Sequence, residues 1–387
     1  MIHHSETKAS TRVRIALIGA GALGSECCRQ IVQLPGADAL IESILLVDPD
    51  ILTRQNVPLS RVYQELFYLN PEQCIGRSKV LILQSFLNRY APLIKVEAIA
   101  APVADVGWQQ LRASHVLVTA TDSALSRMET GLAATTLRIP MLDGAVHANS
   151  TGEGRVSWFT GQNDHACYSC GMSDVSRARL LAQMASPSNG CERLTPALAM
   201  SSAPPDTPSL EITAHRMVQL LCEWTANRSG FLTGSFIVKS DDLARVLAPR
   251  SVTCPWHDVS TAELIELFPD KPFRDQFPRQ EAHQGDQCFE LQWPISLVAS
   301  CEHCGKESRS LLRLAQLRAA SCPHCGDRAL QSDQTVSVIR SRDPLAKLTP
   351  RQLGLPDLHL IRLRPTVQFP PITNGQNEKE TKRATAS

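Results

Sequence analysis

The sequence predicts an α/β protein that is built on a mainly parallel β-sheet and carries a small cysteine-rich module near its C-terminus. The first part of the chain alternates short apolar runs with segments of helical periodicity, which is typical of a parallel sheet covered on both faces. Near the other end, two Cys-x-x-Cys pairs are separated by 17 residues, a spacing typical of zinc ribbons.

The predicted elements of the first part follow one another in a regular order. The run RVRIALIG over residues 12–19 predicts a buried strand that ends at a glycine, and residues 24–34 suit a helix. The alternation continues with a strand, a helix and two further strands, at 43–48, 78–90, 96–100 and 115–121. Strands connected in this way lie parallel in the sheet.

The second part is less regular. The Ser/Pro-rich stretch at 186–208 cannot form one element, because proline ends helices and removes hydrogen bonds from a sheet. A helical segment follows at about 210–224, and the pattern loosens after His257. The polar residues 366–387 predict a disordered tail.

The composition excludes several classes of protein. The chain has 387 residues, 43% hydrophobic and 20% charged, with a net charge of +1. A balance so close to neutral gives no field that would attract nucleic acid or a membrane surface. The N-terminal residues lack the apolar segment of a signal peptide, and no run of 18 apolar residues predicts a membrane span. We therefore expect a cytoplasmic protein with reduced cysteines.

Three glycines predict a nucleotide-binding turn. Gly19, Gly21 and Gly24 of the motif GAGALG lie between the first strand and the first helix. Glycines at this spacing allow a tight turn and the close approach of a phosphate to the helix N-terminus. Asp48 ends the next strand, where a carboxylate can accept hydrogen bonds from ribose hydroxyls. The alternative is a glycine-rich packing turn that binds nothing.

Charged residues further along distinguish an adenylating enzyme from a dehydrogenase. A dehydrogenase needs no lysine and arginine converging on its pyrophosphate, whereas adenylation must neutralise a triphosphate and hold magnesium. Each of these residues alone is most simply a solvated surface group, and only the combination favours ATP chemistry. The residues concerned are Asp50, Asn56, Arg61, Lys79, Asp122 and Arg127.

In this combination the sequence resembles the ThiF/MoeB/ubiquitin-activating superfamily over about residues 12–225. The family pattern is G-x-G-x-x-G, then D-x-D with a following Asn and Arg, then G-x-x-K, then Thr-Asp with a downstream Arg. The matching segments here are GAGALG, DPD, NVPLSR, GRSK and TDSALSR, in which the first arginine lies two residues later than usual. The resemblance implies a Rossmann-like adenylation domain that uses Mg²⁺ and ATP.

The resemblance also implies a role for each matching residue. Asp48 would hold the ribose, and Asp122 would bind magnesium. The ATP phosphates would be contacted by Asn56, Arg61 and Lys79, and the last two would act in catalysis together with Asp122. The whole expected nucleotide site comprises Gly19, Gly21, Gly24, Asp48, Asp50, Asn56, Arg61, Lys79, Asp122 and Arg127.

The expected organisation has three parts. Residues 1–265 would form the adenylation domain, with a crossover loop at about 171–208. Residues 266–365 would form a C-terminal region that contains the zinc ribbon at 301–325. Residues 366–387 would form the tail.

The zinc ribbon is predicted directly from the spacing of its cysteines. Each Cys-x-x-Cys pair is followed by a glycine, as the turns around zinc require. Such ribbons are usually docking modules, and the near-neutral charge favours a protein partner. The four expected ligands are Cys301, Cys304, Cys322 and Cys325.

A second zinc site is implied by the resemblance. In the family, two Cys-x-x-Cys pairs bind a structural zinc at about the places where this chain has Cys167, Cys170, Cys254 and His257. The fourth ligand would here be a histidine, which zinc accepts. The alternative is a set of reduced buried cysteines with a surface histidine.

Cys191 is the expected nucleophile. It lies in the Ser/Pro-rich stretch, and in activating enzymes this crossover loop passes over the adenylate and carries the reactive cysteine. A nucleophilic thiol needs exposure and mobility, which such a loop provides. The alternative is an incidental loop thiol.

The favoured function is the activation of a ubiquitin-like protein. The chain would adenylate the C-terminal carboxylate of the ubiquitin-like protein and then hold that protein as a thioester on Cys191. The ubiquitin-like protein would finally be transferred to a conjugating enzyme. The length of the chain and its zinc ribbon are similar to those of prokaryotic members of the superfamily that are found in ubiquitin-like conjugation operons. Some of these members act in antiviral defence. The family also implies a homodimer, but neither nucleic acid nor membrane is expected as a partner.

Three alternatives remain open from the sequence. The first is an adenylyltransferase for a sulfur-carrier protein of thiamin or molybdopterin synthesis, although the chain has no rhodanese-like segment. The second is a non-catalytic subunit that binds a ubiquitin-like protein, against which Lys79 and Asp122 argue. The third is a dehydrogenase.

Overall fold

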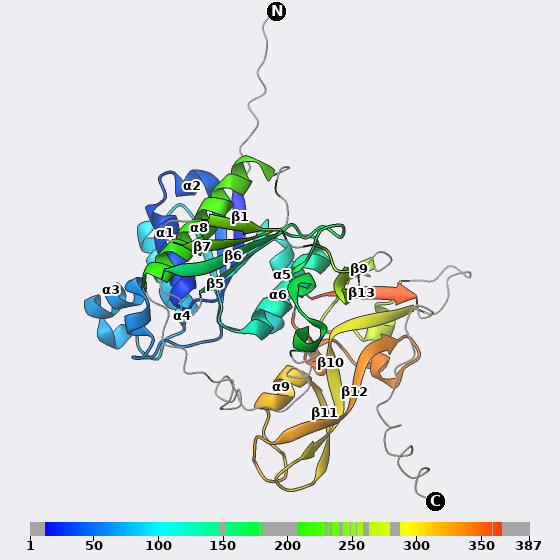
Figure 1. Cartoon of the computed structure of the whole chain (residues 1–387). Helices are drawn as coiled ribbons and strands as arrows, with labels where there is room; N and C mark the ends of the chain where they lie inside the picture. Colours follow the sequence, from blue (N-terminus) through cyan, green and yellow to red (C-terminus); the bar gives the residue numbers. More distant parts are fainter. Residues whose placement is uncertain are drawn as a thin grey trace, which may run out of the picture.

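Two β-sheets organise the part of the chain that this computed structural model describes. That part comprises residues 12–146, 152–177, 180, 207–228, 231, 234–239, 243–247, 249–252, 254–257, 263–278, 287–357 and 359–365. Figure 1 shows the larger sheet and its helices, in blue to green, beside a smaller sheet in yellow to red. No described helix has the length and apolarity that crossing a membrane requires.

The larger sheet has eight strands in the order β3-β2-β1-β4-β5-β6-β7-β8. The first five in this order pair in parallel, and the last three are added antiparallel. The predicted α/β class with a mainly parallel sheet is confirmed. The strands are β1 (Val13–Ile18), β2 (Ile41–Val47), β3 (Lys95–Ile99), β4 (Val116–Thr119), β5 (Met141–Val146), β6 (Glu153–Phe159), β7 (Gly234–Lys239) and β8 (Leu243–Val246).

Strand β1 shows why both faces of this sheet are covered. Its Ile15 and Leu17 belong to one hydrophobic core, and its Ala16 and Ile18 belong to another, because successive side chains of a strand point to opposite faces.

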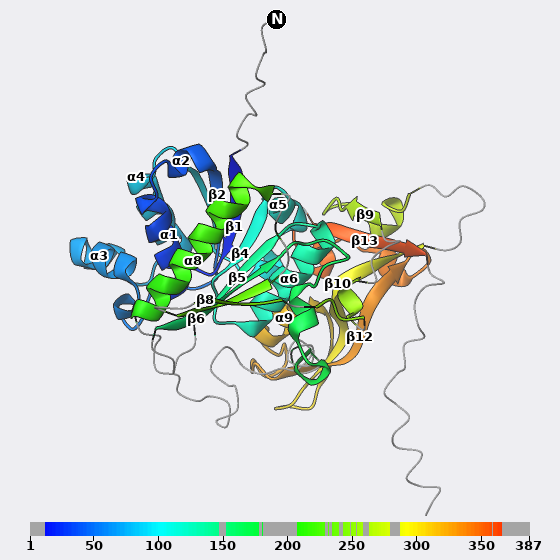
Figure 2. The ribbon, with the colours of Figure 1, turned by 45° about the horizontal axis from the view of Figure 1, so that its top comes forward.

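Separate sets of helices cover these two cores (Figure 2). The first core is covered by α1 (Ala22–Gln33), α3 (Arg61–Leu69), α4 (Lys79–Tyr90) and α8 (Thr207–Ala226), with the short α2 (Ala37–Leu40) at its edge. The second is covered by α5 (Trp108–Arg112) and α6 (Ala124–Leu137).

Helix α8 begins earlier than the sequence predicts. The irregular stretch was expected to reach residue 208, but α8 starts at Thr207. Pro208 lies in the first turn of the helix, where the missing N–H of proline has no helical acceptor to lose. Residues 181–206, with most of that stretch and most of the expected crossover loop, lie outside the described residues.

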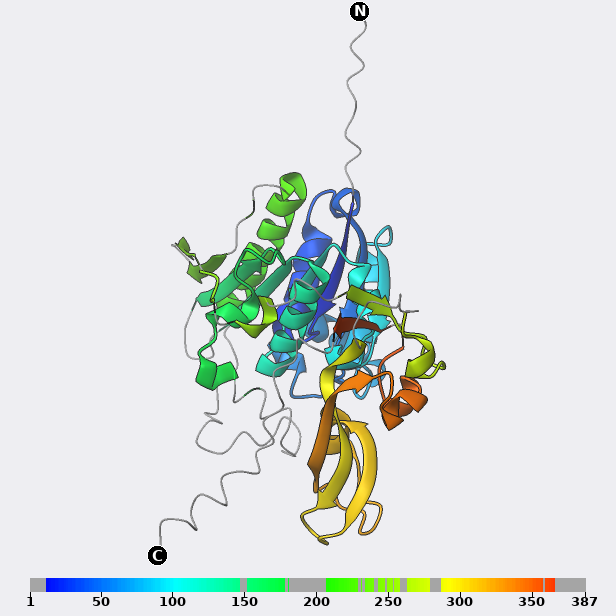
Figure 3. The ribbon, with the colours of Figure 1, turned by 90° about the vertical axis from the view of Figure 1, so that its right-hand side faces the viewer.

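The smaller sheet was not predicted beyond its zinc ribbon. Its strands run in the order β11-β10-β13-β9, with β12 also paired to β10. Figure 3 shows β10, β11 and β12 extending away from the rest of the molecule. The elements are β9 (Glu263–Glu266), β10 (Gln287–Cys301), β11 (Glu307–Arg313), α9 (Leu314–Ala319), β12 (Leu330–Arg340) and β13 (Leu360–Pro365).

The smaller sheet packs against the face of the larger sheet that carries α5 and α6. Leu360 of β13 joins the second core, and Trp293 of β10 packs on Met128 of α6. The guanidinium of Arg313, only 2% exposed, donates a hydrogen bond of 2.8 Å to the carbonyl of Ala104 and pairs with Asp105. The predicted tail at 366–387 lies outside the described residues.

Candidate nucleotide and zinc sites

The glycine turn after β1 leaves open space beside the N-terminus of α1. A Cβ atom on Gly24 would lie 2.0 Å from the carbonyl oxygen of Gly19, and one on Gly19, whose φ is +103°, would lie 2.6 Å from the carbonyl oxygen of Ala120. A Cβ atom on Gly21 would have no neighbour within 4 Å. No side chain caps α1, so its first N–H groups can receive a phosphate.

Asp48 ties this turn to the end of β2. Its carboxylate accepts hydrogen bonds from the N–H of Ala20, at 2.7 Å, and of Asp50, at 2.8 Å. Burial raises the pKa of Asp48, and the two N–H groups act in the opposite direction by stabilising the charged form. The hydroxyl of Tyr63 donates to the carbonyl of Ala20 and so holds the other side of the turn.

Lys79 extends this group of residues. It is the first residue of α4 and only 7% exposed, and its ammonium pairs with Asp50 at 2.8 Å. A buried lysine needs a partner, because an unpaired charge out of water is costly. A continuous polar chain of hydrogen bonds thus runs from the glycine turn to a buried cation. It consists of Ala20, Asp48, Asp50 and Lys79.

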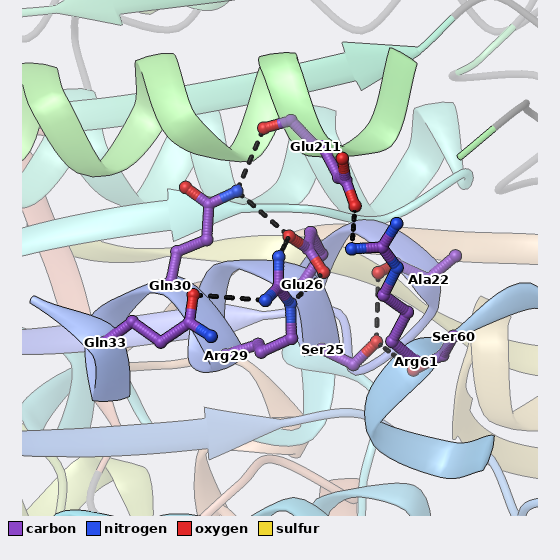
Figure 4. Close-up of polar contacts among 9 residues, drawn as sticks. All are labelled: Ala22, Ser25, Glu26, Arg29, Gln30, Gln33, Ser60, Arg61 and Glu211. Atoms are coloured by element: carbon purple, nitrogen blue, oxygen red, sulfur yellow. Dashed lines mark hydrogen bonds and ion pairs between the residues drawn. The ribbon is translucent and has the colours of Figure 1, made fainter. Parts of the chain in front are cut away.

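Arg61 begins α3 beside the same turn, and Figure 4 shows its surroundings. Its half-exposed guanidinium forms an ion pair with Glu211 of α8. Ser60 caps α3 by accepting from the N–H of Tyr63, and its hydroxyl lies 2.7 Å from that of Ser25 in α1. For Arg61 to bind the ATP phosphates, its guanidinium would have to exchange the carboxylate of Glu211 for a phosphate.

Further contacts in Figure 4 hold α1 against α8. Gln30 donates to the carbonyl of Glu211 at 3.0 Å and to the carboxylate of Glu26 at 2.9 Å. Arg29 donates to the same carboxylate. Glu211 is therefore held in place by its backbone, and its side chain remains available to Arg61.

Asn56 has a structural contact of its own. Its side-chain oxygen accepts from the N–H and the hydroxyl of Thr53, at 3.2 and 2.9 Å, and so closes the loop before α3. Its amide nitrogen is not used in these bonds. Contact between Asn56 and a phosphate remains a prediction.

The residues at the end of β4 divide into an exposed acid and a bound arginine. Asp122 is exposed, just before α6 begins. Arg127 donates to the carbonyls of Thr121, at 2.8 Å, and Gly144, at 2.9 Å, and pairs with Asp143 at 3.4 Å. In this arrangement Arg127 joins the loop after β4 to the middle of β5, and a direct contact with nucleotide remains a prediction.

Asp143 was not singled out in the sequence. It is fully buried in β5 and accepts a hydrogen bond of 2.5 Å from the hydroxyl of Thr119. Burial raises its pKa, while Arg127 and Thr119 act in the opposite direction. Asp143 lies within β5, a strand that the sequence analysis did not predict, so no motif in the sequence identified this residue.

The first cysteine cluster has the geometry of a zinc site. The sulfur of Cys167 lies 3.7 Å from that of Cys170 and 3.6 Å from that of Cys254. Sulfurs at about 2.3 Å from a tetrahedral zinc would be about 3.8 Å apart. The Nε2 atom of His257 lies 3.1 Å from the sulfur of Cys170, and all four ligand atoms lie within 4.8 Å of one another.

The second cluster fits zinc equally well. The sulfur distances are 3.6 Å between Cys301 and Cys325 and 3.7 Å between Cys304 and Cys322. Gly305 and Gly326 follow the pairs with positive φ, +69° and +80°, as these turns demand. The small core around this cluster includes Cys301, Cys304 and Cys322, so metal would supply much of its stability.

Comparison with known proteins identifies the family. The sequence model of the ThiF family matches residues 1–230, more than half of the chain. The chain belongs to the ThiF family. No curated protein matches it.

Remote structural likenesses also exist for this ThiF-family chain. A crystal structure of E. coli MccB with ATP has a TM-score of 0.46 and 14% identity to this chain, covering 64% of this chain and 67% of that one. The structure of PaaA has a TM-score of 0.42 and 16% identity, covering 63% and 66%. Likenesses at this level carry no argument about function.

We expect the ThiF-family chain to bind two zinc ions. Cys304→Ser should reduce the metal content to about one zinc per chain, since zinc requires all four ligands in a structural site. ATP–pyrophosphate exchange should persist, because the ribbon lies apart from the glycine turn. Elemental analysis of the unmodified chain and of the Cys304→Ser variant tests this prediction. A single zinc ion in the unmodified chain would contradict the zinc site at Cys167.

Proposed function

We propose that this ThiF-family chain activates the C-terminus of a ubiquitin-like protein. Adenylation of a polypeptide carboxylate is the chemistry that membership of the family supports. The carboxylate oxygen would attack the α-phosphorus of ATP, forming an acyl-adenylate and releasing pyrophosphate. Cys191 would then attack the acyl carbon, forming a thioester and releasing AMP, before transfer to a conjugating enzyme.

The polar chain at the glycine turn is the observation that carries this proposal. It places the buried ammonium of Lys79 beside Asp50 and Asp48, next to the open space at Gly21. A dehydrogenase has no use for a buried cation there, whereas a departing pyrophosphate needs one. Magnesium held by Asp122 would supply further charge neutralisation.

The burial of other cysteines supports Cys191 as the nucleophile. Outside the two clusters, Cys27, Cys28, Cys74 and Cys288 are buried, and Cys222 is half-buried. Burial raises the pKa of Cys28 to about 12, which leaves almost no thiolate at neutral pH. Cys191 lies outside the described residues, within the expected crossover loop.

The proposal predicts that the two half-reactions separate in a Cys191→Ala variant. Pyrophosphate exchange with the cognate carrier should be retained, because the glycine turn and Lys79 do not involve the thiol. The reductant-sensitive adduct between chain and carrier should disappear from a non-reducing gel. Cys222→Ala is the matched control and should keep both activities.

Two other results would redirect the proposal. An adduct that survives in Cys191→Ala and disappears in Cys222→Ala or Cys288→Ala would move the nucleophile. Exchange without an adduct at any cysteine would favour the sulfur-carrier adenylyltransferase.

A further inference from the structure

A polar cavity of about 240 Å³ lies where the two sheets meet, at the C-terminal end of α6. Helix α6 has 14 residues and is therefore about 21 Å long, so this cavity lies at the opposite end of the helix from Asp122. Residues from α5, α6, β9 and β13 line it, together with Asn163 from the loop after β6.

Positive charge dominates the cavity. Arg112, Arg138 and Arg362 line it, and no carboxylate does so among the described residues. Glu290 pairs with Arg362 at 3.8 Å and offsets one of the three charges. The side chains of Arg112 and Arg138 form no ion pair with the described part of the chain. The partial negative charge of about 0.5 at a helix C-terminus is too small to offset both.

Hydrogen-bond donors accompany these charges. The hydroxyl of Thr136, a residue only 7% exposed, accepts from the guanidinium of Arg362. The hydroxyl proton of Thr136 is donated to no acceptor within the described ranges, so this proton can point into the cavity. The half-buried side chain of Asn163 adds an amide donor. Guanidinium, hydroxyl and amide groups together are the donor set that oxyanions require.

The backbone at Arg138 gives an independent indication. It follows α6 with φ 56° and ψ 41°, the left-handed conformation in which helices usually place glycine. Arginine is strained there, and strained residues cluster where a side chain has a function. In this conformation Arg138 lines the cavity together with Arg112 and Arg362.

We propose that this cavity binds a phosphate-type oxyanion, either free or as a phosphomonoester. The planar guanidinium groups match the oxygens of a phosphate in a bidentate manner. Thr136 and Asn163 would donate to the remaining oxygens. This site is separate from the glycine turn, where the ATP phosphates are expected.

Isothermal titration of the full chain tests the proposal, with inorganic phosphate and glycerol phosphate as probes. Lys79→Ala serves as the background, so that the nucleotide site contributes little. Arg138→Gly removes one guanidinium and relieves the left-handed conformation, so the melting temperature should not fall. Its dissociation constant for the probes should rise about tenfold or more, as the loss of a charged hydrogen bond implies. Arg112→Gln should have a similar effect.

Arg342→Gln is the matched control, because Arg342 is exposed and lies outside the cavity. It should bind both probes like the background protein. Tighter binding of glycerol phosphate than of inorganic phosphate would identify an ester as the ligand, and the reverse would identify the free anion. Unchanged binding in Arg138→Gly, or no binding of either probe to the background protein, would overturn the proposal.

Discussion

Replacing Lys79 by alanine should reduce ATP–pyrophosphate exchange by about 10²-fold or more, the usual effect of removing a preorganised charge from a transition state. Lys79 is buried beside the glycine turn, and its ammonium contacts Asp50. Without it, Asp50 would face the phosphates as an uncompensated negative charge. Asp122→Ala should cause a loss of similar size if that carboxylate holds magnesium.

The control for Lys79→Ala is Lys95→Ala. Lys95 is exposed on β3 and pairs with Glu97 on the same strand, so its removal should leave exchange unchanged. Normal exchange in both Lys79→Ala and Asp122→Ala would remove the adenylation assignment. Circular dichroism of each variant separates a lost charge from a lost fold.

Alanine should destabilise the protein at Gly24 but leave its stability almost unchanged at Gly21. At Gly24 the new Cβ would lie 2.0 Å from a backbone oxygen that cannot move without breaking the turn. We expect a loss of about 3 kcal/mol in the free energy of unfolding, together with the loss of exchange. Thermal or urea unfolding measures the first and a pyrophosphate assay the second.

At Gly21 the new Cβ meets nothing, and φ −74° with ψ −158° is allowed for alanine. Stability should therefore stay within about 0.5 kcal/mol of the unmodified chain. Exchange should nevertheless fall about tenfold or more, because the methyl group would occupy the space that a phosphate needs. A Gly21→Ala chain with full exchange would show that no phosphate approaches the turn at this point.

The parallel part of the large sheet could be predicted because its signals are local. Apolar runs and helical periodicity identify β1 to β4 and the helices α1 and α4 from short windows of sequence. The smaller sheet has no such signal, since Leu360 of β13 pairs with Glu266 of β9 across more than ninety intervening residues. Its longest strand, β10, also loses its regular register between Glu290 and Ile295, which obscures the alternation.

The same distinction applies to the candidate sites. The glycines and the cysteine pairs follow fixed spacings, so the sequence alone placed them in motifs, and their geometry fits those motifs. The partners of Arg61 and Arg127 follow no spacing. Glu211 reaches Arg61 from α8, and Asp143 reaches Arg127 from the next strand of the sheet. Only the folded chain brings such residues together.

The buried position of Arg313 affects how a partner would reach the nucleotide. This residue ends β11, directly before α9, and its guanidinium contacts Ala104 and Asp105, which precede α5 in the part of the chain built on the larger sheet. A protein captured by the ribbon would therefore be tethered at a set distance from the glycine turn. The effective concentration of its C-terminal tail at the glycine turn would then depend on the length of the tail. For a short flexible tail this concentration would be in the millimolar range. A tail too short to span that distance could not react while its protein is held by the ribbon, so docking on the ribbon would favour partners with longer tails without being required for adenylation.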